Sequence, residues 1–202
     1  PDMPAPQRAK YVHITLDKAL RLEKLINEFF EITRYNLQTI ALEKETVNLS
    51  FLLEQMTDEF YPILNDHGNT IRLEAREGEG LIAVHGDGEK LARVFNNILK
   101  NAITYSYPDT EIYVGCKTVG ENVRIRISNR GKTIPRHKLD AIFEKFFRLD
   151  DARATHTGGA GLGLAIAREI VALHHGTITA DSREEVTTFQ VTLPLWHLDI
   201  TE

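Results

Sequence analysis

The sequence predicts an α+β fold, in which helices cover one face of a mixed sheet in a two-layer α/β sandwich, preceded by one long helix. Three observations support this prediction. The first 40 residues carry a helical apolar period and no strand signal. The remainder alternates amphipathic helices with short strand-like runs, and hairpin signals join the later runs, which favours a mixed or antiparallel sheet. We expect two parts, residues 1–42 and 43–202.

Residues 8–40 are expected to form the long helix. Apolar residues recur there at three- and four-residue spacing between charges: Leu22, Leu25, Ile26, Phe29, Phe30, Ile32 and Leu37. A stripe of this width needs an apolar partner. The spacing alone leaves two candidates open, the domain that follows and other helices of a bundle.

Helix and strand signals then alternate along the chain. A second helix is expected from the cap Asn48 to Gly68, with a kink at Pro62. Asp87 caps a strongly periodic helix that ends near Ser106. A further helix over 134–147 opens at Pro135, a polar loop covers 150–157, and a glycine-rich approach precedes the last helix. Strands are expected at 69–75, 81–86, 111–119, 122–129, 176–182 and 187–195, with turns at 120–122 and 183–186.

Composition excludes several function classes. The net charge of −5, without a basic run, argues against nucleic-acid binding. The single cysteine, Cys116, gives neither a disulfide framework nor a metal-ligand spacing and suits a reducing cytoplasm. No apolar segment approaches the roughly 18 residues of a membrane span, so no direct membrane contact is expected of this chain.

The stretch TGGAGLGLAIA, residues 157–167, places four glycines directly before a helix. Ordering a glycine on folding costs conformational entropy, so a cluster of glycines suggests a functional reason. One such reason is anion binding, because exposed N–H groups at a helix N-terminus bind anions such as phosphate. A flexible loop with one glycine packing contact is the alternative. The stretch matches neither the Rossmann fingerprint nor the P-loop.

Two asparagine patterns suggest further contacts. Asn97 and Asn101 share one helix face, where an amide oxygen suits Mg²⁺, although an exposed amide explains them equally well. Asn129, Gly131 and Ile134 stand at a strand end, where an acceptor, an open backbone and an apolar cover suit a purine. A simple loop exit is the alternative for this second pattern.

In order, an Asn-bearing helix, an Asn-x-Gly turn, a Phe-rich segment and a Gly-rich loop resemble the N, G1, F and G2 boxes of sensor histidine kinases. The resemblance runs from Tyr11 onward. It implies the Bergerat (GHKL) ATP-binding fold, with ATP and Mg²⁺ as cofactors. The segments EKLARVFNNILKNAITYS, AIFEKFFRLD and TGGAGLGLAIAREIVALHHG are most similar to the VanS-type sensor kinases of vancomycin resistance.

The resemblance implies roles for the N and G1 boxes. Asn101 is the expected Mg²⁺ ligand, Asn97 its neighbour toward the nucleotide, and Tyr105 a wall of the pocket. Asn129 faces the adenine amine, beside Gly131 and Ile134. Two positions depart from the family pattern: Thr133 replaces a glycine, and Thr104 replaces a lysine that contacts phosphate.

The resemblance also implies roles for the F and G2 boxes. The F box comprises Phe143, Phe146 and Phe147, and Arg148 directly after it is expected to direct charge toward the γ-phosphate. The nucleotide contacts of the G2 box are expected at Gly158, Gly159, Gly161, Leu162 and Gly163. The residues between Arg148 and Gly158 match the family's ATP lid.

The implied function is phosphoryl transfer from ATP to a histidine and then to an aspartate of a response regulator. The long helix resembles the second helix of the family's dimerisation hairpin, which pairs with a second protomer. None of the eight histidines has the family's acceptor context, so we expect this chain to begin after that histidine and to bind ATP without labelling itself. The resemblance implies the cytoplasmic portion of a membrane-anchored sensor.

Two rival functions remain open from the sequence. An ATPase of the same fold, such as a chaperone or mismatch-repair ATPase, needs a carboxylate early in the Asn-bearing helix. Glu89 stands too near the helix start for that role, and Asn97 holds the family position. A binding module without kinase activity is the second rival.

Overall fold

The computed structural model describes residues 3–36, 41–75, 82–149 and 161–196. The chain divides into two compact units, Pro1–Ala41 and Leu42–Glu202. Among the described helices, none combines the length and the apolar character that crossing a bilayer requires.

The first unit contains one long helix, α1 (Ala5–Asn36), which confirms the predicted helix. Leu22, Ile26 and Phe30 of the predicted apolar stripe are exposed, at 58%, 45% and 61%. The stripe extends toward the N-terminus through the exposed Val12, Leu16 and Leu20. The side chains of Leu25, Phe29 and Ile32, and residue 37, lie outside the described part. This helix therefore presents a long apolar surface.

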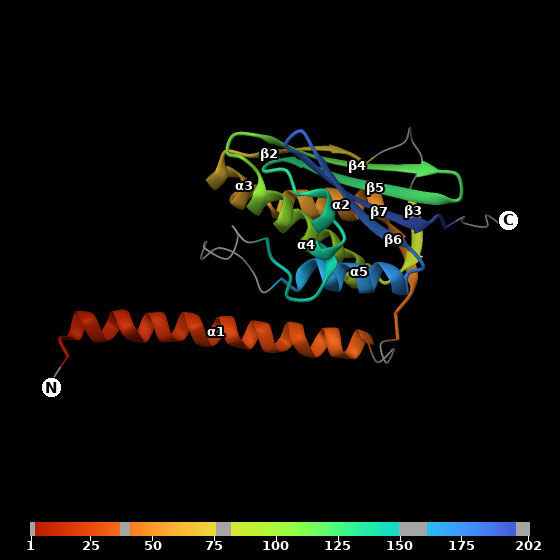
Figure 1. Ribbon diagram of the computed structural model, residues 1–202. Helices are drawn as coiled ribbons and strands as arrows, with labels where there is room; N and C mark the ends of the chain where they lie inside the picture. Colours follow the sequence, from red (N-terminus) through yellow and green to blue (C-terminus); the bar gives the residue numbers. More distant parts are fainter. Residues whose placement is uncertain (1–2, 37–40, 76–81, 150–160, 197–202) are drawn as a thin grey trace. The chain divides into compact units, whose positions relative to one another are not determined.

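The second unit is built on a mixed five-stranded sheet in the order β2-β4-β5-β7-β6 (Figure 1). Its strands are β2 (Thr70–Glu74), β4 (Glu111–Val119), β5 (Asn122–Arg130), β6 (Thr177–Arg183) and β7 (Val186–Pro194). β2 and β4 are parallel and the other pairs are antiparallel. The predicted mixed sheet with hairpins between its later strands is confirmed.

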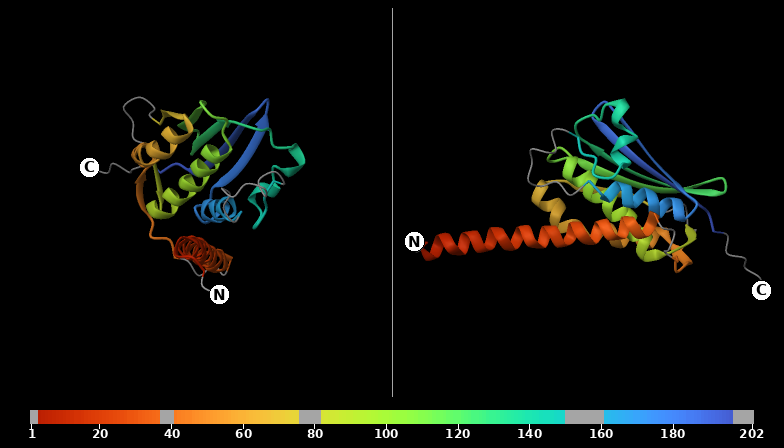
Figure 2. Two further views of the ribbon diagram at one scale, coloured as in Figure 1. Left: turned by 90° about the vertical axis from the view of Figure 1, so that its left-hand side faces the viewer. Right: turned by 60° about the horizontal axis from the view of Figure 1, so that its bottom comes forward.

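Helices cover one face of this sheet and leave the other face open (Figures 1 and 2). They are α2 (Leu49–Glu59), α3 (Tyr61–His67), α4 (Gly88–Tyr105) and α5 (Gly163–Leu173). Alternate strand residues point into the core between the layers, which is formed mainly by Phe95, Ile98, Leu99, Ile125, Ile127, Ile166, Ile170 and Val191. Polar residues such as Arg126 and Gln190 occupy the open face. The predicted two-layer architecture is therefore confirmed.

Local signals in the sequence explain the helix ends. The Asn48 side chain accepts a hydrogen bond from the Phe51 N–H (3.1 Å), and Asp87 Oδ1 accepts one from the Lys90 N–H (3.0 Å), so both predicted caps are confirmed. The predicted kink near Pro62 divides the second helix into α2 and α3, because proline lacks the N–H that would continue the ladder.

The prediction of a helix over residues 134–147 is wrong. Two short 3-10 turns occupy this segment, at Arg136–Lys138 and Ala141–Phe143. Glu144 is extended and Phe146 has a φ of 63°, which no α-helix tolerates. The segment is held by its neighbours, since Phe143 packs edge-on against Phe189 of β7 with ring centroids 6.4 Å apart.

One strand was not predicted. β1 (Glu45–Asn48) pairs antiparallel with β3 (Ala83–Gly86) in a separate two-stranded sheet. Its four residues are too few to show an alternating pattern. Only the partner strand defines it, and the paired residues are 35 to 41 positions apart in the chain.

Candidate nucleotide site

Asn97 on α4 lies against the first residue of α5. A Cβ built on Gly163 would be 3.3 Å from Asn97 Oδ1, a tight contact that shows how closely the two helices approach here. Asn97 Nδ2 is buried and has no hydrogen-bond partner among the described residues. A buried amide donor without a partner costs free energy, so this position calls for a hydrogen-bond acceptor that the described residues do not supply.

The start of α5 presents an open helix N-terminus. Leu162 is the N-cap residue and no side chain caps the helix, so the N–H groups of the first turn lack an intrahelical partner. Gly161 before it has a φ of 76°, and its carbonyl accepts a hydrogen bond from the Phe146 N–H (3.0 Å). A Cβ at Gly161 would lie 2.7 Å from the Phe147 carbonyl oxygen. This glycine is therefore required by both backbone conformation and space.

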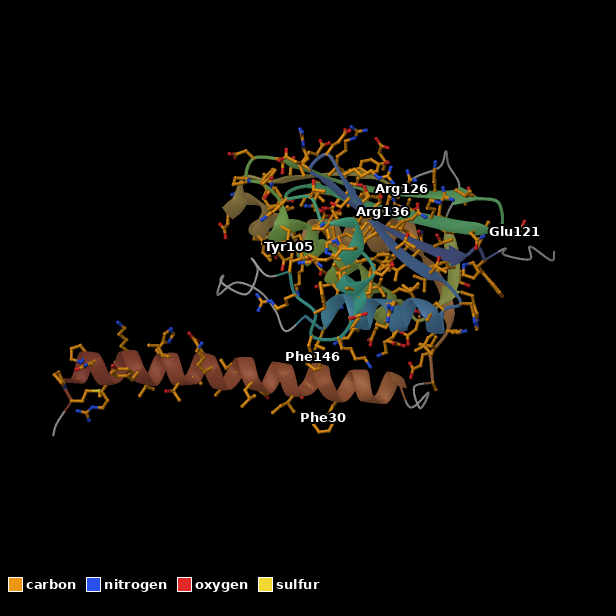
Figure 3. The ribbon with its side chains drawn as sticks, viewed as in Figure 1. Phe30, Tyr105, Glu121, Arg126, Arg136 and Phe146 are labelled. Carbon is orange, nitrogen blue, oxygen red and sulfur yellow. The ribbon has the colours of Figure 1, made fainter. Side chains whose placement is uncertain are left out.

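Asn97, Asn101 and Tyr105 follow one another at four-residue spacing along α4. The two asparagines are half-buried, whereas Tyr105 is 46% exposed at the end of the helix. Eight helical residues span about 12 Å. The row thus runs from the start of α5 toward the end of β5. Figure 3 shows Tyr105 and Phe146 on the left-hand part of the domain, away from Glu121 at the β4–β5 turn.

Gly131 joins the end of β5 to the end of α4. A Cβ on Gly131 would lie only 2.0 Å from the Tyr105 carbonyl oxygen, and the Tyr107 N–H donates to the Arg130 carbonyl (2.8 Å). From the sequence, we expected this glycine to let a flat ring approach the backbone. The contact with Tyr105 supplies a sufficient reason of its own, which is packing of the strand end on the helix.

A row of buried polar side chains crosses three strands beside Gly131. Asn129 of β5, Thr187 of β7 and Ser182 of β6 are in register, and each is at most 6% exposed. Ser182 Oγ and Thr187 Oγ1 are 2.8 Å apart, and Ser182 Oγ accepts a hydrogen bond from the Ile134 N–H (2.9 Å). The neighbouring row is apolar, so this polar row marks the end of the hydrophobic core.

The sequence analysis missed Ser182 and Thr187. Strict alternation in β7 placed Thr187 on the same face as Phe189 and Val191, which was a usable signal. Ser182 had no comparable signal, because its role depends on the pairing of β6 with β7.

Arg148 is half-buried two residues after Phe146, whose N–H donates to the Gly161 carbonyl. Thr104, at the place of the family's lysine, uses its hydroxyl within α4, where it donates to the Lys100 carbonyl (2.6 Å). Gly158 and Gly159 lie outside the described residues.

These residues fit a nucleotide with a bound metal ion. The Asn97 amide, for which the described ranges offer no partner, and the α5 N-terminus suit phosphate oxygens, and the polar row suits a base edge. The described residues contain no cluster of three or more histidine, cysteine or acidic side chains that would hold a metal alone. An amide oxygen such as that of Asn101 is a ligand type that Mg²⁺ accepts together with phosphate oxygens and water.

The C-terminal end of α5 contains a second buried polar side chain, His174, and both of its ring nitrogens have hydrogen-bond partners. His174 Nε2 accepts a hydrogen bond from the Asp87 N–H (2.9 Å), and Nδ1 lies 2.8 Å from the Ile170 carbonyl oxygen. Burial lowers the pKa of His174, although the bond to Ile170 opposes this shift. Because Nε2 accepts the bond from the Asp87 N–H, His174 is a neutral, structural side chain at the end of α5.

Comparisons with known proteins agree on one family. The family model described as "Histidine kinase-, DNA gyrase B-, and HSP90-like ATPase" matches residues 86–197. The chain is 59% identical to the sensor protein VanS of Enterococcus faecium and 46% identical to VanSC of Enterococcus gallinarum, in each case over 96% of this chain. It spans 50% and 53% of these two relatives.

A solved structure shares the fold. The histidine kinase ThkA, in a complex with response regulator protein TrrA, matches with a TM-score of 0.71 and 25% identity. The match covers 96% of this chain and 53% of that chain. The likeness thus includes both the mixed sheet and the helices that carry the candidate site.

Proposed function

Since the chain belongs to the family of histidine kinase-, DNA gyrase B- and HSP90-like ATPases, we propose that it is the ATP-binding catalytic part of a two-component sensor histidine kinase. The observation that carries this proposal is the buried Asn97 amide, which has no hydrogen-bond partner in the described part of the chain, together with the open N-terminus of α5. The similarity to VanS and VanSC supports a role in glycopeptide (vancomycin) resistance signalling.

Each end of the site has its own task in this proposal. The α5 N-terminus, Gly161, Leu162 and Gly163 hold phosphate groups through backbone N–H donors. Asn97 donates to a phosphate oxygen, which satisfies its buried amide. Arg148 adds positive charge toward the terminal phosphate, and Gly158 and Gly159 remain proposed contacts.

The base end and the metal complete the proposed site. Asn129 accepts from the adenine amine, with Thr187 and Ser182 beside it and Ile134 and Tyr105 as walls of the pocket. Asn101 is the magnesium ligand. The bound Mg²⁺ neutralises phosphate charge as the phosphoryl group leaves, and the protein contributes mainly by positioning.

The whole protein would transfer the γ-phosphoryl group to a histidine and then to an aspartate of a response regulator. ThkA, which this chain resembles, is described in a complex with its regulator, and that supports the partner class. The exposed stripe of α1 suits pairing with a second protomer. We place the chain in the cytoplasmic portion of a membrane-anchored sensor, by its similarity to VanS.

The rival ATPase activity requires a carboxylate that activates water. Glu89 is exposed in the first turn of α4, two turns before Asn97. The position that faces Gly163 is an amide instead. An amide positions a phosphate but accepts no proton from water, which favours the kinase over the ATPase.

Isothermal titration calorimetry with a non-hydrolysable ATP analogue and Mg²⁺ tests the binding. We expect one saturable site in this chain and a loss of magnesium-dependent affinity in Asn101→Ala. The absence of any heat or of any shift in melting temperature at saturating nucleotide would contradict the proposal.

Labelling with γ-labelled ATP tests the chemistry. We expect acid-labile label on the full-length protein and none on this chain alone, since none of its eight histidines has the acceptor context. Steady phosphate release by this chain without transfer would favour the rival ATPase.

A further inference from the structure

The hairpin turn between β6 and β7 is strained. Its two central residues, Glu184 and Glu185, have φ values of 50° and 62°. A two-residue turn with both φ values positive is normally formed by Asn-Gly or Asp-Gly, and a glutamate in this conformation costs on the order of 1 kcal/mol. Such strain persists only where the surroundings impose it, often beside a functional site.

The surroundings of this turn are the residues at the base end of the candidate site. The Gly131 N–H donates to the Glu185 carbonyl (2.8 Å), and the Glu185 N–H donates to Thr133 Oγ1 (2.9 Å). Both backbone groups of Glu185 are thus bonded to the segment 129–134. That segment also carries Asn129 and Ile134.

The Glu185 side chain ties the turn to the end of α4. Tyr107 Oη donates to Glu185 Oε1 (3.0 Å), and this bond raises the pKa of Tyr107 above its ordinary value. One residue therefore joins the hairpin, the strand-end loop and the Asn-bearing helix.

We propose that the Glu184-Glu185 turn is a strap that fixes segment 129–134, so that Thr133 and Tyr107 determine affinity for the nucleotide base and not for the phosphates. The inference rests on the proposed nucleotide binding. Thr133 stands where the family pattern has glycine, and glycine offers no hydroxyl to the Glu185 N–H. The strap is therefore a property of this chain's own residues.

The position of the strap explains the selectivity. The strap contacts segment 129–134, which meets α4 at Tyr105. The α5 N-terminus meets α4 at Asn97, which is about 12 Å away from Tyr105 along the helix. Loosening the strap lets Asn129 and Ile134 shift relative to a base. Gly161, Leu162 and Gly163 stay in place, because the Gly161 carbonyl is bonded to the Phe146 N–H and the next two residues begin α5.

The experiment compares affinity for ATP with affinity for inorganic tripolyphosphate, both with Mg²⁺, in wild type, Thr133→Val and Thr133→Ser. Valine has the shape of threonine without the acceptor, and serine restores the hydroxyl. We expect Thr133→Val to weaken ATP binding about three- to tenfold, the value of one hydrogen bond, while tripolyphosphate affinity is unchanged. Thr133→Ser should recover ATP affinity, and Tyr107→Phe should weaken it in the same direction.

Thr188→Val is the matched control. Thr188 Oγ1 pairs with Ser128 Oγ (2.9 Å) on the open face of the sheet, so the variant also loses a hydroxyl contact, on the face away from the site. Its ATP affinity should equal that of wild type. The strap is overturned if Thr133→Val leaves ATP affinity unchanged or lowers both affinities equally. If wild type binds no ATP, the proposed function itself fails and the strap with it.

Discussion

Buried polar side chains lie at both ends of the helical layer, but the hydrogen bonding of these side chains differs between the two ends. At one end, both ring nitrogens of His174 lie within hydrogen-bonding distance of backbone partners, the Asp87 N–H and the Ile170 carbonyl. At the other end, Asn97 Nδ2 is buried with no partner among the described residues. The first arrangement has both of its polar atoms paired, whereas the second leaves a donor that the described residues do not satisfy.

This difference distinguishes a buried side chain that stabilises the fold from one that a ligand can complete. A satisfied buried group holds elements together, here β3, α4 and α5 around His174. An unsatisfied one lowers stability in the free chain and is retained where a ligand completes it. The stabilities and affinities of variants at the two ends should therefore change in opposite ways.

The largest effect is expected for Asn97→Leu, a change of similar shape. Loss of a hydrogen bond to a charged phosphate should weaken ATP binding about 10- to 100-fold. The free chain should become more stable, because the variant removes the unsatisfied donor. Calorimetry and chemical denaturation measure the two quantities.

Asn96→Leu, one position earlier on α4, is the control, and its ATP affinity should stay near that of wild type. A loss of stability in Asn97→Leu would mean that Asn97 has a structural partner, and would remove the contrast between the two ends.

His174→Leu should show the reverse behaviour. It leaves the buried Asp87 N–H without an acceptor, so unfolding free energy should fall by about 1–3 kcal/mol. ATP affinity of the folded protein should be unchanged. Denaturant titration measures the unfolding free energy. Calorimetry well below the melting temperature measures the ATP affinity.

The adjacent His175→Asn serves as control for His174→Leu. His175 is exposed with a φ of 58°, a conformation that asparagine tolerates, so stability should hardly change. A comparable loss in both variants would indicate that the helix end, and not the imidazole bonds of His174, determines the effect.

Acid should affect the His174 end in a defined direction. Burial lowers the pKa of His174 in the folded chain, whereas in the unfolded chain it titrates near the ordinary value of about 6.5. As pH falls through that value, the unfolded chain takes up a proton that the folded chain does not, so stability decreases until the lower folded-state pKa is reached. Unfolding free energies from pH 8 to 5 measure this slope, which should be smaller in His174→Leu.

Much of the fold was predictable because its signals are local. The caps Asn48 and Asp87, the break near Pro62 and the hairpin at Gly120 each act within a few residues. The segment 134–147 shows the limit of such signals. Its apolar spacing suits a helix, but contacts of Phe143 with β7 and of Phe146 with Gly161 determine its course.

The candidate site divides in the same way. Asn97 and Asn101 stand on one helix face by spacing alone, and the glycines precede a helix. The contact of Gly131 with Tyr105, the row formed by Asn129 with Thr187 and Ser182, and the bond from Glu185 to Thr133 depend on strand order and register. No local pattern encodes these, because the partners are tens of residues apart.

The smallest expected effect concerns the strained turn at the binding end. Glu184→Asn places a residue that tolerates positive φ at a position whose φ is 50°, and should raise the unfolding free energy by up to about 1 kcal/mol. Chemical denaturation measures this gain. Glu121→Asn, at the β4–β5 turn, is the control, and no gain is expected there because Glu121 has no positive φ.

ATP affinity of Glu184→Asn should match wild type, because the bonds to Gly131, Thr133 and Tyr107 all come from Glu185. Strain at Glu184 would then be a consequence of holding Glu185 in place and not itself a requirement for binding. A variant that gains stability but loses ATP affinity would show the opposite. The strained backbone at Glu184 would then belong to the binding end in the same sense as the unsatisfied Asn97 amide.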